Sequence, residues 1–132
     1  MNDTDSEVPV PRGELSLKLV STYNNANGFG DIYGGWVVSQ MDVAGNHYAA
    51  KIAHGRVATV GIGKMAFLLP VTVGSTLSFY TEVITIGRSS IKMNVEVWVC
   101  YPAENELRKV TEAGIAFVAI TKKGNTRAIS QP

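Results

Sequence analysis

The sequence has few residues that cross-link or bind metals, and it carries almost no excess charge. Cys100 is its only cysteine, which excludes an internal disulfide and fits a reducing compartment. Two histidines without ligand spacing argue against a metal site. The formal net charge is +1, so charge predicts neither duplex DNA nor an anionic membrane as the main partner.

Long apolar runs are also missing. No run reaches the roughly 18 residues that a membrane-spanning helix requires. The first residues, 1–8, are acidic and polar, unlike the basic start and apolar stretch of a secretory signal. A cytoplasmic location is therefore the expectation.

The 132 residues, 45% of them hydrophobic and 17% charged, are enough for one globular domain. Strand-like alternation of apolar and polar residues covers 15–19, 75–86, 91–99 and 108–120. A β-prone stretch, 57–69, is broken by Gly61 and Gly63, which indicates a bend or bulge. Between the first two strands, a loop over 23–35 precedes a helical pattern from Trp36 to about Ala53. Gly55 is placed to end that helix.

This order predicts an α+β domain, with a curved antiparallel sheet of about five strands wrapped around one long central helix. We expect the domain to span 13–121, between a flexible tail over 1–12 and a polar tail over 122–132. In the last strand, Val118 and Ile120 alternate with Phe117 and Ala119, so both faces are apolar. A sheet with two apolar faces predicts a partner subunit.

One carboxylate, Asp42, lies within the helical segment among residues that are mostly apolar or small. Burying an ionised carboxylate is costly unless it is paired, so such a group is often retained for chemistry. Gly45 and Ala49 share its helix face, and their small size is expected to leave room for a ligand beside the carboxylate. The alternative is an ordinary helix residue that faces solvent.

A Gly34-Gly35 pair opens the helix two turns before Asp42. Glycine lets a backbone approach a ligand closely, and the first N–H groups of a helix lack intrahelical partners. The helix dipole is positive there, so these amides can hold a carbonyl oxygen as it gains negative charge. A carboxylate near such a site indicates acyl transfer, most simply hydrolysis.

Several motifs in the chain resemble one family. They are 25–28 (NANG), 34–42 (GGWVVSQMD), 53–57 (AHGRV), 67–71 (FLLPV) and 94–99 (NVEVWV). Together they look like the acyl-CoA thioesterases of the hotdog fold, closest to the short bacterial YciA-type branch. The resemblance covers about residues 13–127. It implies hydrolysis of acyl-CoA to free acid and CoA, without a metal or redox cofactor, in a dimer or a hexamer built as a trimer of dimers.

The resemblance also places the site. It implies that Asp42 is the catalytic carboxylate, as general base or as nucleophile, and that Gly35, next to Gly34, supplies the oxyanion amide. An assisting position three residues before the glycine pair falls on Asp31, and Asn27 is expected to contact the substrate. Family sites form between two subunits, so Asp31 and Asp42 facing one thioester are expected to come from different chains.

Other residues are candidates for the CoA phosphates by their own chemistry. Arginine forks suit phosphate oxygens, and turns offer free N–H groups. The candidates are Arg56, Arg88, Ser89 and Ser90, for which a solvated turn is the alternative. Lys122, Lys123 and Arg127 are weaker candidates, because a charged tail commonly serves solubility alone.

The chain departs from the bacterial pattern at three places. Phe29-Gly30 is an extra pair before Asp31, and Leu69 and Gly61 stand where arginine is usual. Two other functions remain as alternatives. A hotdog CoA dehydratase would need a catalytic histidine, and neither histidine is well placed. A non-catalytic acyl-CoA-binding regulator would need no helix carboxylate.

Overall fold

The structure is a computed structural model that describes residues 9–129, so most of the expected N-terminal tail lies outside the described residues. The elements are β1 (Glu14–Val20), the 3-10 turn η2 (Tyr23–Asn25), α1 (Gly34–Ala53), β2 (Val57–Ile62), β3 (Thr76–Ile86), β4 (Ser90–Cys100) and β5 (Arg108–Ala119). The strands form one antiparallel sheet in the order β1-β3-β4-β5-β2. The expected α+β architecture is confirmed.

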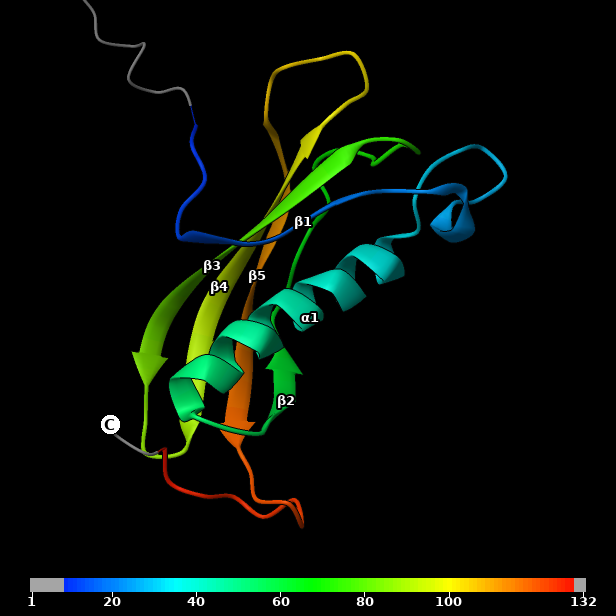
Figure 1. The fold of residues 1–132 in the computed structure, drawn as a ribbon. Helices are drawn as coiled ribbons and strands as arrows, with labels where there is room; N and C mark the ends of the chain where they lie inside the picture. Colours follow the sequence, from blue (N-terminus) through cyan, green and yellow to red (C-terminus); the bar gives the residue numbers. More distant parts are fainter. Residues whose placement is uncertain (1–8, 130–132) are drawn as a thin grey trace, which may run out of the picture.

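The helix α1 lies across one face of the curved sheet (Figure 1). Met93, Val95 and Val97 in β4 point to this face and are fully buried, as the alternating pattern predicts. Gly45 sits where the helix meets β5, since a Cβ there would lie 2.9 Å from the Phe117 ring. The small residues on this helix face therefore let the helix approach the sheet, and the expectation that they leave room beside Asp42 is wrong.

The helix ends at Ala53, as expected. His54 adopts the left-handed conformation, with φ 55° and ψ 41°, and closes the helix. Gly55 follows it and donates its N–H to Ala50 O at 3.1 Å. Gly55 thus follows the helix end as expected, but the left-handed conformation belongs to His54.

The strand β2 is shorter than the β-prone stretch that predicted it. A bulge between Thr59 and Gly61 breaks its pairing with β5, as the glycines indicated. Beyond Ile62 the chain continues alongside β5 through single hydrogen bonds, from Gly63 N–H to Gly114 O at 2.8 Å and from Leu68 N–H to Val110 O at 2.7 Å. Residues 63–70 thus form an extended segment beside the sheet edge.

The C-terminal segment packs on the domain as far as residue 129. Arg127 donates to Ala53 O at 3.1 Å and to Ile120 O at 3.0 Å, and Ile129 is buried. The guanidinium therefore satisfies a carbonyl at the end of α1. The packed chain extends beyond the boundary expected at residue 121.

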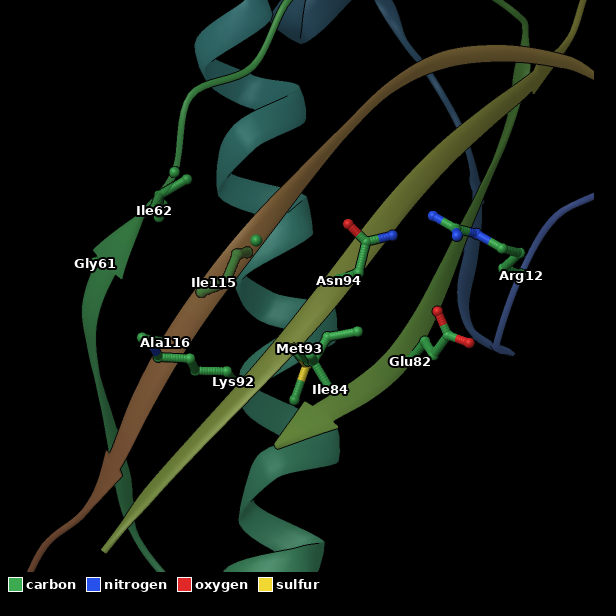
Figure 2. Close-up of a pocket in the computed structure, with 12 residues that line it drawn as sticks. Arg12, Gly61, Ile62, Glu82, Ile84, Lys92, Met93, Asn94, Ile115 and Ala116 are labelled. Carbon is green, nitrogen blue, oxygen red and sulfur yellow. The ribbon is translucent and has the colours of Figure 1, made fainter. Parts of the chain in front are cut away.

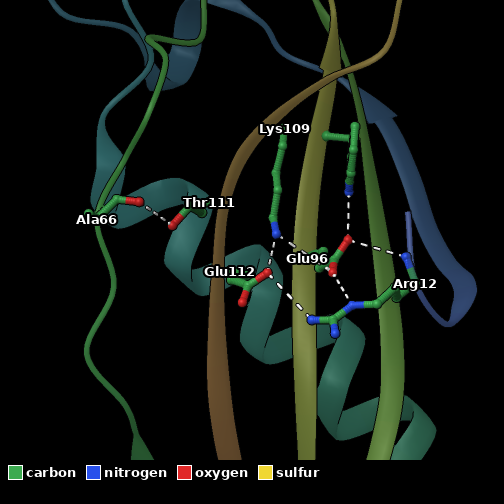
Figure 3. A network of polar contacts seen from close by, with 7 residues as sticks. Arg12, Ala66, Glu96, Lys109, Thr111 and Glu112 are labelled. Atoms are coloured by element: carbon green, nitrogen blue, oxygen red, sulfur yellow. Dashed lines mark hydrogen bonds and ion pairs between the residues drawn. The ribbon is translucent and has the colours of Figure 1, made fainter. Parts of the chain in front are cut away.

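The sheet face away from the helix carries a buried carboxylate, Glu96 (Figure 3). It accepts hydrogen bonds from Trp98 Nε1 at 2.8 Å and from Arg12 Nε at 3.1 Å. Burial raises the pKa of Glu96, but the donors from Trp98 and Arg12 and the charge of Lys109 outweigh it, so the pKa lies below the ordinary value. Arg12 is thereby anchored to the domain, although it was expected in the flexible tail.

Candidate active site

The carboxylate of Asp42 is held by a neighbour on another element. The Thr59 hydroxyl donates a 2.5 Å hydrogen bond to Asp42 Oδ1, joining the middle of α1 to the edge strand β2. Asp42 is half-buried. Sequence reasoning did not single out Thr59, because periodicity along the chain does not say which strand residue faces a given helix residue. The sequence signal closest to Thr59 was the break in the β-prone stretch at Gly61, which predicted a bend or bulge there.

The N-terminus of α1 presents free backbone amides. Tyr33 occupies the N-cap position without a side-chain cap, and the first bond back to it is from Trp36 N–H to Tyr33 O at 3.1 Å. Within residues 9–129, the N–H groups of Gly34 and Gly35 have no hydrogen-bond partner. Gly35 is exposed, with no atom within 4 Å of where its Cβ would be. A ligand oxygen can therefore reach these amides.

Gly35 and Asp42 share one side of the helix. Seven residues separate them, so they differ by about 20° around the axis and by about 10.5 Å along it. The amide and the carboxylate of one chain are thus aligned but two helical turns apart.

The loop before the helix brings Asn27 and Asp31 together. Asn27 N–H donates to Asp31 O at 2.8 Å, and the Asn27 side-chain oxygen accepts from Asp31 N–H at 3.1 Å. The same oxygen accepts from Phe29 N–H at 2.8 Å, and Asp31 also forms a bridge to Thr72. Asn27 therefore shapes this loop, and the extra residue Phe29 projects from it with its side chain 91% exposed.

A small apolar pocket adjoins the free amides. It has a volume of about 230 Å³ and lies between the start of α1 and the end of the extended segment that leads to β3. Its lining is Ile32, Gly34, Val37, Phe67, Leu69, Pro70 and Val71. Leu69, one of the departures from the family pattern, thus supplies part of an apolar wall.

The residues expected to bind CoA phosphates lie at the other end of the helix. Arg56 donates to Lys122 O at 2.7 Å, Ser89 O accepts from Ala119 N–H, and Arg88 O accepts from Ile129 N–H. Ser90 O closes the turn between β3 and β4 by accepting from Gly87 N–H. The 20-residue helix is about 30 Å long, so these residues are far from Asn27 in the same chain.

A larger hollow, of about 540 Å³, lies on the sheet face away from the helix (Figure 2). Ile62, Ile84 and Lys92 line it, together with Asn94. Asn94 Nδ2 is buried there and has no hydrogen-bond partner among the described residues. None of Asp31, Gly34, Gly35 and Asp42 borders this hollow, so its size does not make it the catalytic site.

The described chain contains no helix that is long and apolar enough to cross a membrane. Across residues 9–129, no group of three or more His, Cys, Asp or Glu side chains is arranged to hold a metal ion. His47 and His54 are both exposed.

Comparison with known proteins supports one family. The family model for the thioesterase superfamily matches residues 29–99. The acyl-CoA thioester hydrolase YciA of Escherichia coli is 42% identical over 123 residues, covering 91% of this chain and 93% of that protein. An uncharacterized acyl-CoA thioester hydrolase of Haemophilus influenzae is 41% identical over 131 residues, covering 97% of this chain and 85% of that protein.

Solved structures agree with the sequence relatives. The hexameric thioesterase y2039 from Yersinia pestis superposes with a TM-score of 0.87 at 41% identity, covering 93% of this chain and 100% of that one. HI0827, a hexameric broad specificity acyl-coenzyme A thioesterase, superposes with a TM-score of 0.88 at 40% identity, covering 93% of this chain and 85% of that one. The chain belongs to the thioesterase superfamily, in its YciA-like branch of acyl-CoA thioester hydrolases.

Proposed function

We propose that this protein hydrolyses acyl-CoA to a free carboxylic acid and CoA. The observation that carries the proposal is the Asp42 carboxylate, held by Thr59 on a helix whose first amides are free. A carboxylate and unpartnered amides on one side of a helix are the groups that acyl transfer to water requires. The names of the relatives support the same reaction.

The reaction assigns each group a role. The thioester oxygen accepts hydrogen bonds from Gly35 N–H, with Gly34 beside it, and these stabilise the negative charge of the tetrahedral intermediate. Asp42 either takes a proton from the attacking water or attacks the carbonyl carbon itself, and water then releases the acid. In both routes the carbon–sulfur bond breaks, and the CoA thiolate leaves and is protonated.

We infer that a complete site combines two chains. Gly35 and Asp42 of one chain are about 10.5 Å apart along the helix, whereas reacting atoms approach within about 3.5 Å. The edge strand β2 lies next to Asp42, and its Val60 side chain is 61% exposed. Pairing of two β2 edges would bring Asp42 of one chain towards the glycines and Asp31 of the other. Hexameric relatives support a trimer of such dimers.

The two ends of the helix suggest how CoA lies. Asp42 is 11 residues, or about 16.5 Å, from the end of α1, a span suited to the extended pantetheine arm. Arg56, Arg88, Ser89 and Ser90 would hold the phosphates at that end. Asn27 would flank the thioester from the loop that precedes the glycines.

Both routes use only water, the Asp42 carboxylate and backbone amides to cleave the thioester, so we propose no metal or redox cofactor. We also propose a cytoplasmic site of action, in line with the single Cys100. A dehydratase would need a histidine at the site, but His47 is about 140° around the helix axis from Asp42, and His54 lies at the C-terminal end of α1. An acyl-CoA-binding regulator would have no use for the Asp42–Thr59 pair.

The role of the Gly35 amide is tested by a matched pair of variants. Gly35→Pro removes the N–H at the first turn, where proline is tolerated because that N–H has no intrahelical partner. Gly35→Ala keeps the N–H and meets no atom within 4 Å. Removing one oxyanion donor lowers kcat by a factor of about 10²–10³. We therefore expect a decrease of that size in Gly35→Pro and only a small decrease in Gly35→Ala.

CoA release from a panel of acyl-CoAs measures both variants, and circular dichroism checks that each is folded. Equal activity of the two folded variants would remove the Gly35 amide from the mechanism. Binding of CoA by the wild type without turnover of any acyl-CoA would favour the regulator.

A further inference from the structure

The apolar pocket beside the free amides is a separate feature from the catalytic groups. Gly34 lies both in its lining and next to Gly35, so the pocket opens where the thioester carbonyl would rest. The rest of its lining is hydrocarbon side chains from the start of α1 and from residues 67–71. A carbonyl held on Gly35 N–H would direct one of its two substituents into this space.

The pocket of one chain has room for a short to medium acyl group. An apolar cavity of about 150 Å³ holds a benzene ring, so about 25 Å³ serves each carbon, and a volume of about 230 Å³ takes roughly nine carbons. We propose that this pocket receives the acyl chain and that the preferred substrates carry short to medium chains of up to about nine carbons or one aromatic ring. This inference rests on the proposed function.

Phe67 forms one wall of the pocket. Its ring would lie 3.3 Å from a Cβ placed on Gly34, so it borders the space beside the helix start. The backbone on both sides of Phe67 is fixed to β5, because Ala66 O accepts from Thr111 Oγ1 at 2.8 Å and Leu68 N–H donates to Val110 O. Removing the ring should therefore lengthen the pocket while the backbone keeps its place.

The test is kcat/KM for straight-chain acyl-CoAs from acetyl-CoA to palmitoyl-CoA. For the wild type we expect a rise of about fourfold per methylene that enters the pocket, and a fall beyond about nine carbons. Phe67→Ala should move the optimum to longer chains by several carbons. Leu69→Ala, which widens another wall, should move it in the same direction. Leu68→Ala is the control, because Leu68 does not line the pocket and its side chain is 65% exposed.

Two results would overturn the inference. One is an active Phe67→Ala enzyme whose chain-length profile matches that of the wild type. The other is a changed inhibition constant for free CoA with the profile unmoved, which would place the pantetheine arm in the pocket. Absence of acyl-CoA turnover in the wild type would instead overturn the proposed function, so the two failures are distinguishable.

Discussion

At the scale of single residues, the contact between Asp42 and Thr59 is the clearest addition to what the sequence indicated. A hydroxyl that donates to a carboxylate makes a charge-assisted hydrogen bond and fixes the direction of the free carboxylate oxygen. Thr59 is thus a positioning residue in the proposed mechanism. Its effect should fall on the chemical step rather than on CoA binding.

Replacing Thr59 by valine keeps the shape of the side chain and removes the donor. A hydrogen bond to a charged group is worth about 1.5–3 kcal/mol, so Thr59→Val should lower kcat by roughly ten- to a hundredfold and change KM little. Thr59→Ser restores a hydroxyl and should recover most of the rate. A valine variant with unchanged kcat, or a serine variant as slow as valine, would argue against positioning by this hydroxyl.

The buried carboxylate of Glu96 should make stability depend on pH. Its pKa is lowered in the folded protein, so its stabilising effect is present above the ordinary glutamate value of about 4.3 and is lost as pH falls through the lower folded value. Glu96→Gln removes the nearer carboxylate partner of Arg12 and leaves it only the more distant Glu112 at 3.8 Å, so it should cost about 1–3 kcal/mol near neutral pH.

The measurement is denaturant unfolding of both proteins at one protein concentration over a series of pH values. We expect the difference in unfolding free energy to be constant above about pH 5 and to shrink towards more acidic pH. A difference that grows on acidification would contradict a lowered pKa for Glu96.

Which site residues could be found from the sequence follows from their surroundings along the chain. Asp42 and the glycine pair stand out because a charge in an apolar helix and a flexible start are local features. The role of Thr59 cannot be found from local features, since its partner Asp42 lies 17 positions away on another element. The two backbone carbonyls that hold Arg56 were equally hidden, because they lie at the expected boundary between the domain, which was to end at Thr121, and the tail, which was to begin at Lys122.

At the scale of elements, periodicity predicted the helix and the three long strands well. Their register against each other, and the length of β2, depended on tertiary contacts. A strand needs a continuous partner, and beyond Ile62 the chain meets β5 only at isolated points. The end of α1 at Ala53 was predicted, but His54 takes the left-handed conformation that is easier for the glycine beside it, which the sequence could not show.

Gly45 tests the packing of the helix on the sheet. Gly45→Ala should gain up to about 1 kcal/mol of helix propensity, but a Cβ 2.9 Å from the Phe117 ring forces the buried interface apart. Such overpacking costs about 1–3 kcal/mol, so we expect a net loss of stability in thermal or denaturant unfolding. Gly35→Ala, in the same helix with open space around it, is the control and should be close to the wild type. Equal stability of the two variants would contradict this, because it would mean that the contact between the helix and the sheet accepts the extra methyl group without loss of unfolding free energy.

At the scale of the whole molecule, the apolar residues on both faces of the sheet and the open edge at β2 indicate that one chain is incomplete. The sequence predicted a partner from the pattern of β5, but it could not show which edge or face the partner covers. The structure adds that β1 and β2 are the two edges and that Asp42 lies beside β2.

A charge on the β2 edge tests the proposed dimer. Lysine on an edge strand opposes pairing with another chain. Val60→Lys should shift the protein to monomers in sedimentation or light scattering and remove most of its activity. Val20→Lys carries the same charge on the other edge, where the native side chain is 56% exposed, and should keep the assembly and the activity. A fully active monomer of Val60→Lys would contradict a site shared between chains.

The central claim is that Asp42 performs the chemistry of acyl-CoA hydrolysis. Its most direct test is the rate of CoA release by the wild type and by Asp42→Asn, which keeps the size of the side chain and removes its charge. We predict turnover by the wild type and a loss of roughly a hundredfold or more in the variant, in keeping with general acid–base catalysis. A folded Asp42→Asn protein with wild-type activity would contradict the account and leave Asp42 a structural partner of Thr59.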